Sequence, residues 1–97
     1  MNFEDMLEES LNLKINIRLI QRNARKCITL VENIEEIENI DVSKVNKVLK
    51  KLLSCNGSVK KEDGVSILQF QGDQREPIKN FLMETFELKE ENIIVHG

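Results

Sequence analysis

The chain concentrates positively charged side chains in two places. Five cations lie between residues 14 and 26, and the stretch QRNARK at residues 21–26 holds three of them beside two side-chain amides. Arginine forks pair bidentately with phosphate oxygens, and lysine supplies a compact point charge. A second set of cations recurs at helical spacing after Asp41. Both sets are typical of a surface that binds a phosphate backbone, and the second consists of Lys44, Lys47, Lys50 and Lys51.

Charge is sorted along the chain, although the net charge is only −3. Residues 1–13 carry four acids and residues 27–43 carry five, in both cases without a base. Residues 14–26 carry five bases and residues 44–61 carry six, in both cases without an acid. We therefore expect one basic and one acidic surface in the folded protein. Nucleic-acid binding is favoured, and a module that binds another protein is the alternative.

Residues that could carry catalysis are few. His96 is the single histidine, and the chain has no nucleophile elbow, no phosphate-binding glycine loop and no zinc-protease motif. Asp73 and Glu76 have the spacing of a helix capping box, which explains them better than a catalytic carboxylate pair. Cys27 and Cys55 form no C-x-x-C pair and are expected to be reduced packing residues. We predict a protein that is not an enzyme and needs neither cofactor nor metal; a small phosphatase-like sandwich is the enzyme alternative.

Length and composition predict one cytoplasmic domain. The 97 residues are 40% hydrophobic and 32% charged, which is typical of a single globular core. No run of about 18 apolar residues is present, so no membrane span is expected. The acidic N-terminus lacks the features of a secretory signal. Residues 1–13 are expected to be an acidic tail, and residues 14–97 one folded domain.

The basic stretch QRNARK is predicted to be the tip of a hairpin. Ile15, Ile17 and Leu19 alternate with more polar residues, which indicates a half-buried strand, and a second strand is predicted at residues 27–31. An acidic connection then leads to an N-cap at Asp41 or Ser43. The helix that follows has an apolar face and a separate lysine face, and the pair Asn56-Gly57 is expected to end it. The apolar face is predicted to contain Val42, Val45, Val48, Leu49, Leu52 and Leu53.

The second half repeats the pattern of two strands and a helix. A strand starts at residue 58, a turn is expected at residues 62–64, and the run VSILQF returns as its partner. A second helix has Pro77 in its first turn and an apolar face of Ile78, Phe81, Leu82 and Phe86. Residues 93–95 form a closing strand. The order ββαββαβ predicts an α+β two-layer sandwich, with a mixed sheet of about five strands and both helices on one face.

Four short motifs give the chain a family resemblance. They are QRN-x-RK at residues 21–26, CNG-[ST]-V at 55–59, QGDQR at 71–75 and a terminal VHG, in that order. Together they resemble the eukaryotic translation initiation factor 1 family, from about Lys14 to Gly97. The resemblance implies the same α+β fold. It also implies a factor that binds the small ribosomal subunit near the P site, promotes scanning, enforces AUG selection and leaves when the start codon is recognised.

The resemblance also assigns roles to residues. It implies rRNA contacts at the hairpin tip and the lysine face, by Gln21, Arg22, Asn23, Arg25, Lys26, Lys44, Lys47, Lys50 and Lys51. The second loop would face the initiator tRNA with Lys60, Lys61, Glu62 and Asp63. The remaining motif residues, expected to be mainly structural, are Asn56, Gly57, Gly72, Asp73, Gln74 and Arg75.

The implied partners belong to the initiation machinery. They are the small ribosomal subunit, the initiator tRNA complex and initiation factors 1A, 2, 3 and 5, with a monomer off the ribosome. A related domain that acts in re-initiation or subunit recycling is the alternative. The chain departs from the family pattern at Ala24, where glycine is usual, at Leu52, where lysine is frequent, and in a second loop that is shorter and lacks its proline.

Overall fold

The computed structural model describes residues 13–96, and its order of elements matches the predicted one. The first half contains β1 (Ile15–Gln21), β2 (Cys27–Glu32), a 3-10 turn η1 (Ile34–Glu36) and helix α2 (Val42–Leu53). The second half contains β3 (Gly57–Glu62), β4 (Val65–Gln71), helix α3 (Arg75–Phe86), η2 (Glu90–Asn92) and β5 (Ile93–His96). The expected acidic tail lies outside the described residues except for Leu13, which is half-buried against the core.

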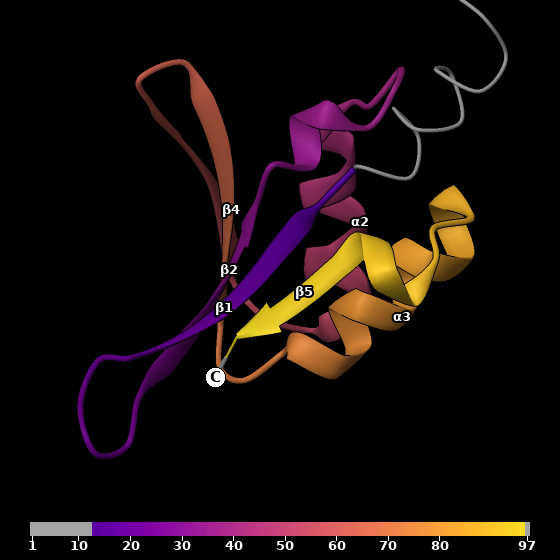
Figure 1. Cartoon of the computed structure of the whole chain (residues 1–97). Coiled ribbons are helices and arrows are strands. Elements are labelled where there is room, and N and C mark those ends of the chain that lie inside the picture. Colours follow the sequence, from indigo (N-terminus) through magenta and orange to yellow (C-terminus); the bar gives the residue numbers. More distant parts are fainter. Residues whose placement is uncertain (1–12, 97) are drawn as a thin grey trace, which may run out of the picture.

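The strands form one mixed five-stranded sheet in the order β3-β4-β2-β1-β5. All neighbours are antiparallel except β1 and β5, which are parallel. Both helices lie against one face, and the other face is left uncovered (Figure 1). The predicted two-layer α+β sandwich is therefore confirmed. Parallel pairing of β5 with β1 requires a long crossover, which α2, the second hairpin and α3 supply.

The core lies between the sheet and the two helices. Alternate residues of β1 and β4 point into it, including Ile15, Ile17, Leu68 and Phe70, all fully buried. From the helices it receives Val45, Leu49, Ile78 and Leu82. The strands alternate with period two and each helix buries one stripe, so the hydrophobic pattern alone determines which face of each element turns inward.

Helix α2 begins where predicted but ends differently. The side chain of Asp41 accepts a hydrogen bond from the backbone N–H of Lys44 at 3.1 Å, so Asp41 rather than Ser43 is the N-cap. At the other end Ser54 adopts the left-handed conformation, with φ of 51°. The expectation that Asn56-Gly57 would end the helix is wrong, because the chain has already left the helix at Ser54 and Gly57 opens β3.

The apolar face of α2 is narrower than its spacing predicts. Val45 and Leu49 are buried, whereas Val48 and Leu52 are 43% and 61% exposed. The sheet covers only a stripe along the helix, and α3 packs beside that stripe without covering Val48 or Leu52. Exposed apolar side chains therefore flank the lysines of α2.

Helix α3 lacks the predicted capping box. Its N-cap is Gln74, which makes no side-chain cap hydrogen bond, and Pro77 lies in the first turn as expected. Asp73 lies one residue too early to cap the helix through its third residue. Its carboxylate instead accepts a hydrogen bond from the backbone N–H of Arg75 at 3.3 Å and pairs with the Arg75 guanidinium. Asp73 thus closes a local turn before the helix.

Gly57 of β3 lies very close to the ring of Phe70 in β4 and to the side chain of Lys50 in α2. A Cβ atom built there would lie 2.6 Å from Phe70 Cδ1 and 3.0 Å from Lys50 Cγ. Phe70 is fully buried and cannot move aside without opening the core. Glycine at this position is therefore required by packing between strands rather than by helix termination.

We predict that Gly57→Ala lowers the free energy of unfolding by about 1–3 kcal/mol, the usual cost of overpacking a core. Urea unfolding followed by circular dichroism measures it. Ser58→Ala, at the exposed neighbouring position, is the control and should change stability by less than about 0.5 kcal/mol. Equal stability of the two variants would contradict the packing argument.

Candidate nucleic-acid interface

The tip between β1 and β2 is a compact loop built around Asn23. The backbone N–H of Arg22 donates to the Lys26 carbonyl at 2.8 Å. The side-chain oxygen of Asn23 accepts from the backbone N–H groups of Arg25 and Lys26 at 2.9 and 3.0 Å. No residue from 22 to 26 has a positive φ, so Ala24 fits without the conformational freedom of glycine. Asn23 orders the loop, and its cationic neighbours are left exposed.

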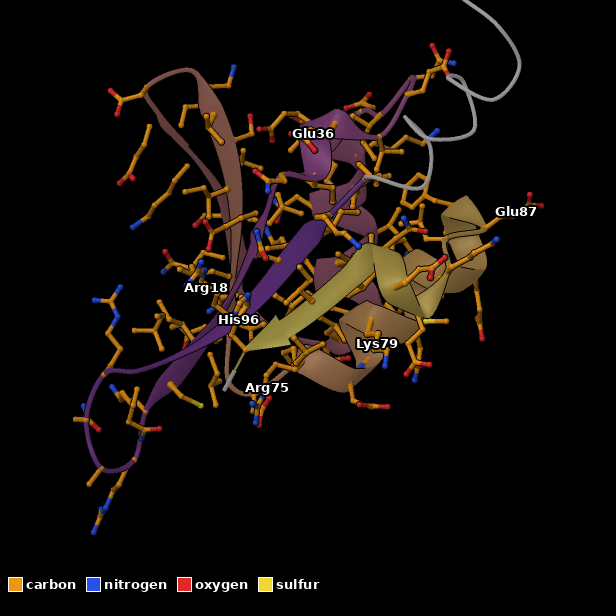
Figure 2. The ribbon with its side chains drawn as sticks, in the orientation of Figure 1. Arg18, Glu36, Arg75, Lys79, Glu87 and His96 are labelled. Atoms are coloured by element: carbon orange, nitrogen blue, oxygen red, sulfur yellow. The ribbon has the colours of Figure 1, made fainter. Side chains whose placement is uncertain are left out.

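The cations of the first basic block do not all remain free. Arg18 forms an ion pair with Glu32, because β1 and β2 are antiparallel and set Glu32 opposite Asn16, the residue that shares a sheet face with Arg18. Lys14 donates to the Glu91 carbonyl at 2.8 Å. Arg18, which is labelled in Figure 2, therefore meets an acid in the fold although none is near it in the sequence, so the expectation of five cations clear of acids is wrong for this residue. Within residues 13–96, Arg22, Arg25 and Lys26 take part in no ion pair.

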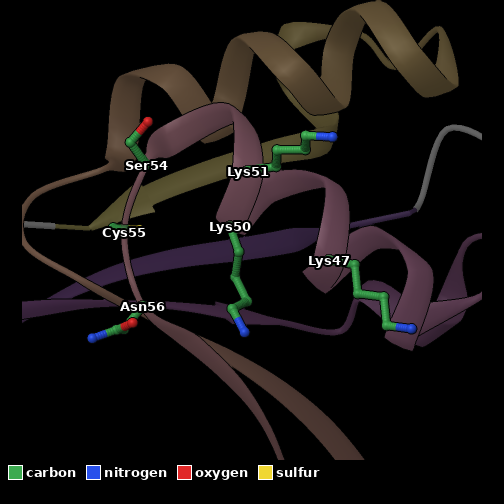
Figure 3. A pocket seen from close by; sticks show the side chains of 6 residues that line it. All are labelled: Lys47, Lys50, Lys51, Ser54, Cys55 and Asn56. Carbon is green, nitrogen blue, oxygen red and sulfur yellow. The ribbon is translucent and has the colours of Figure 1, made fainter.

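Three of the four lysines of α2 line an open hollow near the C-terminal end of the helix. The hollow has a volume of about 480 Å³ and is shown in Figure 3. Lys44, at the first turn of α2, lies outside it. None of these lysines belongs to an ion pair within the described chain. The lining residues are Lys47, Lys50, Lys51, Ser54, Cys55 and Asn56, and we call this site the lysine hollow.

Two backbone hydrogen bonds bring the hairpin tip and the end of α2 to the same end of the sheet. The Gly72 N–H donates to the Cys27 carbonyl at 2.9 Å, at the base of the tip. The Gln71 N–H donates to the Asn56 carbonyl at 3.1 Å, just after α2. Residues 71 and 72 therefore join the two basic surfaces, which lie 18 or more residues apart in the sequence.

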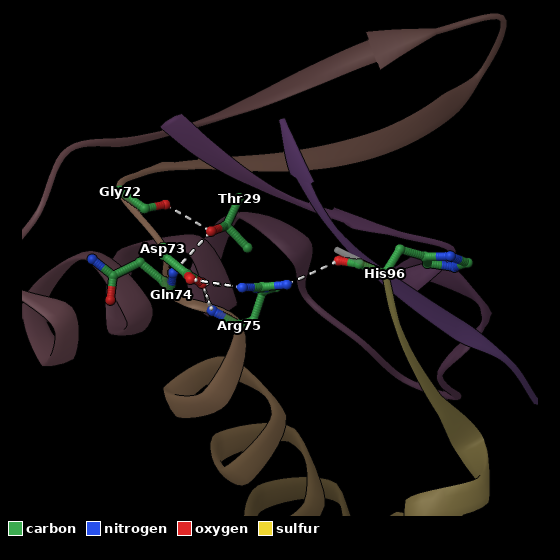
Figure 4. Close-up of polar contacts among 6 residues, drawn as sticks. All are labelled: Thr29, Gly72, Asp73, Gln74, Arg75 and His96. Carbon is green, nitrogen blue, oxygen red and sulfur yellow. Dashed lines mark hydrogen bonds and ion pairs between the residues drawn. The ribbon is translucent and has the colours of Figure 1, made fainter. Parts of the chain in front are cut away.

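The QGDQR motif is held in place by a buried hydroxyl. Thr29 of β2 is fully buried, and its hydroxyl donates to the Gly72 carbonyl at 2.7 Å and accepts from the Gln74 N–H at 2.9 Å (Figure 4). Gly72 has a φ of 84°, a conformation that glycine adopts without strain. These contacts give the predicted structural residues Gly72 and Gln74 their roles.

Asp73 and Arg75 form a bidentate pair on the surface of the same turn. Arg75 donates to the Asp73 carboxylate through Nε at 2.9 Å and Nη2 at 2.8 Å. The hydrogen bond from Arg75 lowers the pKa of Asp73, and the same contact raises the pKa of Arg75. Arg75 Nη1 also reaches the His96 carbonyl at 3.5 Å. The charge of Arg75 is thus paired inside the turn, unlike the cations of the hairpin tip.

The second predicted loop lies at the opposite end of the sheet. Glu62 pairs with Val65, so Asp63 and Gly64 form a two-residue turn with φ of 50° and 81°. Positive φ at both positions is typical of the type I′ hairpin turn. Lys60 and Lys61 are exposed beside this turn. The second loop is therefore separated from the first by the length of β4.

Within residues 13–96 no three His, Cys, Asp or Glu side chains gather closely enough to hold a metal ion. His96 Nε2 lies 3.1 Å from Asn16 Oδ1, in a contact across the β1–β5 pair. No helix in the described part has the length and apolar character needed to cross a bilayer. The basic surfaces remain the chemical feature to explain.

Comparison with known proteins identifies the family. Residues 12–89 match the family model described as translation initiation factor SUI1. The chain belongs to the SUI1 family of translation initiation factors. The resemblance to eukaryotic translation initiation factor 1 that the motifs indicate is thereby confirmed.

Individual SUI1-family relatives align over most of the chain. The chain is 38% identical over 84 residues to protein translation factor sui1 of Schizosaccharomyces pombe, covering 86% of this chain and 75% of that protein. It is 40% identical over 84 residues to eukaryotic translation initiation factor eIF-1 of Saccharomyces cerevisiae, covering 86% and 76%. The C-terminal domain of human eIF2D has a similar fold, with a TM-score of 0.73 and 26% identity over 82% of this chain and 41% of that one.

Some residues that shape this SUI1-family surface are missing from the sequence prediction. Thr29 reads as an ordinary strand residue, and its hydroxyl gains its role only from the contact between β2 and the turn after β4. Ser54 and Cys55 line the lysine hollow because α2 ends earlier than its pattern suggests. A threonine on the inward face of a strand is the one local signal that could have revealed the buried network.

We predict that Thr29→Val lowers the free energy of unfolding by about 1–3 kcal/mol, because it leaves the Gly72 carbonyl and the Gln74 N–H, both part-buried, without their hydrogen-bond partner. Thr29→Ser keeps the hydroxyl and loses one methyl group, so it should cost only about 1 kcal/mol. Urea unfolding compares the two. A valine variant as stable as the serine variant would show that the hydroxyl is dispensable.

Proposed function

We propose that the protein binds the small ribosomal subunit near the P site and acts there in start-codon selection. The contact is with rRNA, through the tip residues Gln21, Arg22, Arg25 and Lys26 and the lysines of α2. The observation that carries this proposal is the convergence of two sets of unpaired cations at one end of the sheet in a SUI1-family chain. Asn23 contributes by ordering the tip.

Electrostatics would supply most of the affinity for rRNA. Cations that are already paired with carboxylates gain little from a phosphate, whereas the tip cations and α2 lysines are exposed and free of such pairs in the described chain. Each phosphate neutralised releases counterions, so affinity falls steeply with salt. For about five phosphates the log–log salt slope is roughly −4, at about −0.7 to −0.9 per contact. A factor held in this way is easily released.

Release on start-codon recognition is the mechanistic core of the proposal. The bound factor favours an open complex that scans, and it opposes full accommodation of the initiator tRNA. Lys60, Lys61, Glu62 and Asp63 face that tRNA in the proposed complex, at the other end of the sheet from the anchoring tip. A clash there needs only a few kcal/mol to expel the factor, since each 1.4 kcal/mol changes affinity about tenfold.

The proposed setting is the cytoplasmic initiation machinery. The partners are the initiator tRNA complex and initiation factors 1A, 2, 3 and 5, with the free protein a monomer. The proposed role is binding rather than catalysis, in keeping with the translation initiation factors to which the chain is related. Action in re-initiation or subunit recycling is the alternative, and the fold likeness to a domain of human eIF2D is the observation that favours it. Identities of 38–40% over most of two single-domain-sized relatives favour the first function.

We predict that replacing Arg22, Arg25 and Lys26 with glutamine weakens binding to purified small ribosomal subunits and changes the salt slope from about −4 to about −2. Fluorescence anisotropy of the labelled full chain across a salt series measures it. The matched control replaces Lys14, Lys79 and Lys89, which lie around η2, and so removes the same charge elsewhere. Equal slopes for the two triple variants would refute anchoring by the tip.

We predict that the same tip variant raises initiation at UUG relative to AUG, because a factor that leaves too readily no longer opposes imperfect pairing. The ratio is measured with paired reporters in a translation extract whose own factor has been replaced. The lysine control variant should leave the ratio near the wild-type value. A tip variant that binds weakly with an unaltered ratio would make the protein a passive binder and would remove start-codon selection from the proposal.

A further inference from the structure

A second, smaller hollow adjoins the lysine hollow. Its volume is about 130 Å³, and it opens on the side of the sheet that the helices leave uncovered. Asn56 lines both hollows, so they share one wall. In Figure 3 the side chains of Lys50 and Asn56 both extend away from α3. The lining residues are Asn56, Gly57, Ser58, Gln69 and Gln71, and we call this site the amide hollow.

The register of the sheet explains why these polar groups converge. Gln69 and Gln71 alternate along β4 with the buried residues Leu68 and Phe70, so they point away from the core. Ser58 of β3 lies directly opposite Gln69. Asn56 reaches the same place because its carbonyl accepts the Gln71 N–H. Three side-chain amides and one hydroxyl therefore meet around a single opening.

The lining side chains have unused hydrogen-bonding capacity. Several amides elsewhere in the described chain are occupied: Asn23, Gln74 and Asn92 each bond to backbone groups, whereas Asn46 Oδ1 is buried without a partner. The side chains of Asn56, Ser58, Gln69 and Gln71 make no such bond among residues 13–96. Each amide offers two donors and one acceptor without charge. That combination matches the edge of a nucleobase, and a glutamine amide pairs bidentately with N6 and N7 of adenine.

The surroundings of the amide hollow suit a nucleotide. On one side lies the lysine hollow, whose charges would attract phosphates. On the other side β2 places Leu30 opposite Gln69 and Ile28 opposite Gln71, and Ile20 beyond them is 40% exposed. Ile28 is itself buried, so the exposed Ile20 and the partly exposed Leu30 are the apolar side chains that can contact the face of a base. The cationic tip follows directly, since Gln21 pairs with Cys27 at its base.

We propose that the amide hollow binds the base of an unpaired adenosine in RNA while the lysine hollow binds phosphates of the adjoining nucleotides. The inference rests on the proposed function in that the ligand is RNA. It goes further by assigning base recognition to Asn56, Gln69 and Gln71, side chains that carry no charge. The protein then reads one exposed base as well as the charge and shape of folded RNA.

The test uses two RNA hairpins that differ at one position. One carries a single bulged adenosine, and the other carries an abasic nucleotide at the same place, so charge and backbone are matched. Fluorescence anisotropy with the full chain should show about tenfold tighter binding of the adenosine hairpin, the effect of one or two net hydrogen bonds. Equal affinity of the wild-type chain for the two hairpins would overturn the inference, and this comparison needs no variant.

Two variants test whether the preference for the adenosine hairpin comes from the amide hollow. The double variant Gln69→Met/Gln71→Met removes both amides and keeps the charge and the approximate side-chain length. It should bind both hairpins with the affinity that the wild-type chain has for the abasic hairpin. Lys47→Met, in the lysine hollow, should weaken binding of both hairpins alike and keep the tenfold ratio. A double methionine variant that retains the preference would also overturn the inference. Binding to purified small subunits is scored separately: a chain that binds subunits but treats the hairpins alike keeps the proposed function and loses only base recognition.

Discussion

Three segments that are distant in the sequence are held side by side at one end of the sheet, and both basic surfaces depend on this junction. Cys27 closes the hairpin tip, Asn56 follows α2, and Gln71 and Gly72 end β4 between them. Two backbone hydrogen bonds, of 2.9 and 3.1 Å, join the three segments. The buried hydroxyl of Thr29 fixes the turn that contains Gly72. Without this junction the tip and the lysine face would not be held at the same end of the sheet.

The elements of the fold could be predicted from the sequence because their signals are local. Alternation in β1 and β4, the apolar stripe of α2 and the Asp41 cap each depend on residues within a turn or two of one another. Where prediction failed, a distant contact decided the outcome. Arg18 pairs with Glu32 across two strands, and Val48 and Leu52 stay exposed because no element among residues 13–96 packs over that side of α2. Asp73 is the exception, because a local contact decides it: Asp73 bonds to Arg75 instead of capping the helix, which begins one residue later than the capping box requires.

The candidate site was predictable in its charges but not in its geometry. The charge of an arginine or lysine is evident from the sequence, whereas the structural role of a glycine or threonine is not. The sequence pattern predicts that Gly57 ends a helix, yet glycine is required there because of Phe70, thirteen residues along the chain, whose ring leaves no room for a Cβ atom. Thr29 has no sequence signature beyond its inward position. Residues that arrange a site act through strand pairing, which a linear pattern records only weakly.

Charge and hydrogen bonding have separate tasks on this surface. Lysine and arginine attract any phosphate backbone over about a Debye length, and they give affinity without choosing a position along it. Uncharged amides act only at contact distance and need a matched donor and acceptor, so they discriminate while adding little to long-range attraction. The junction places Asn56 and Gln71 between the cations of α2 and those of the tip. In the proposed complex, RNA attracted by either basic surface would pass over these amides, which could add selectivity for a base without adding charge.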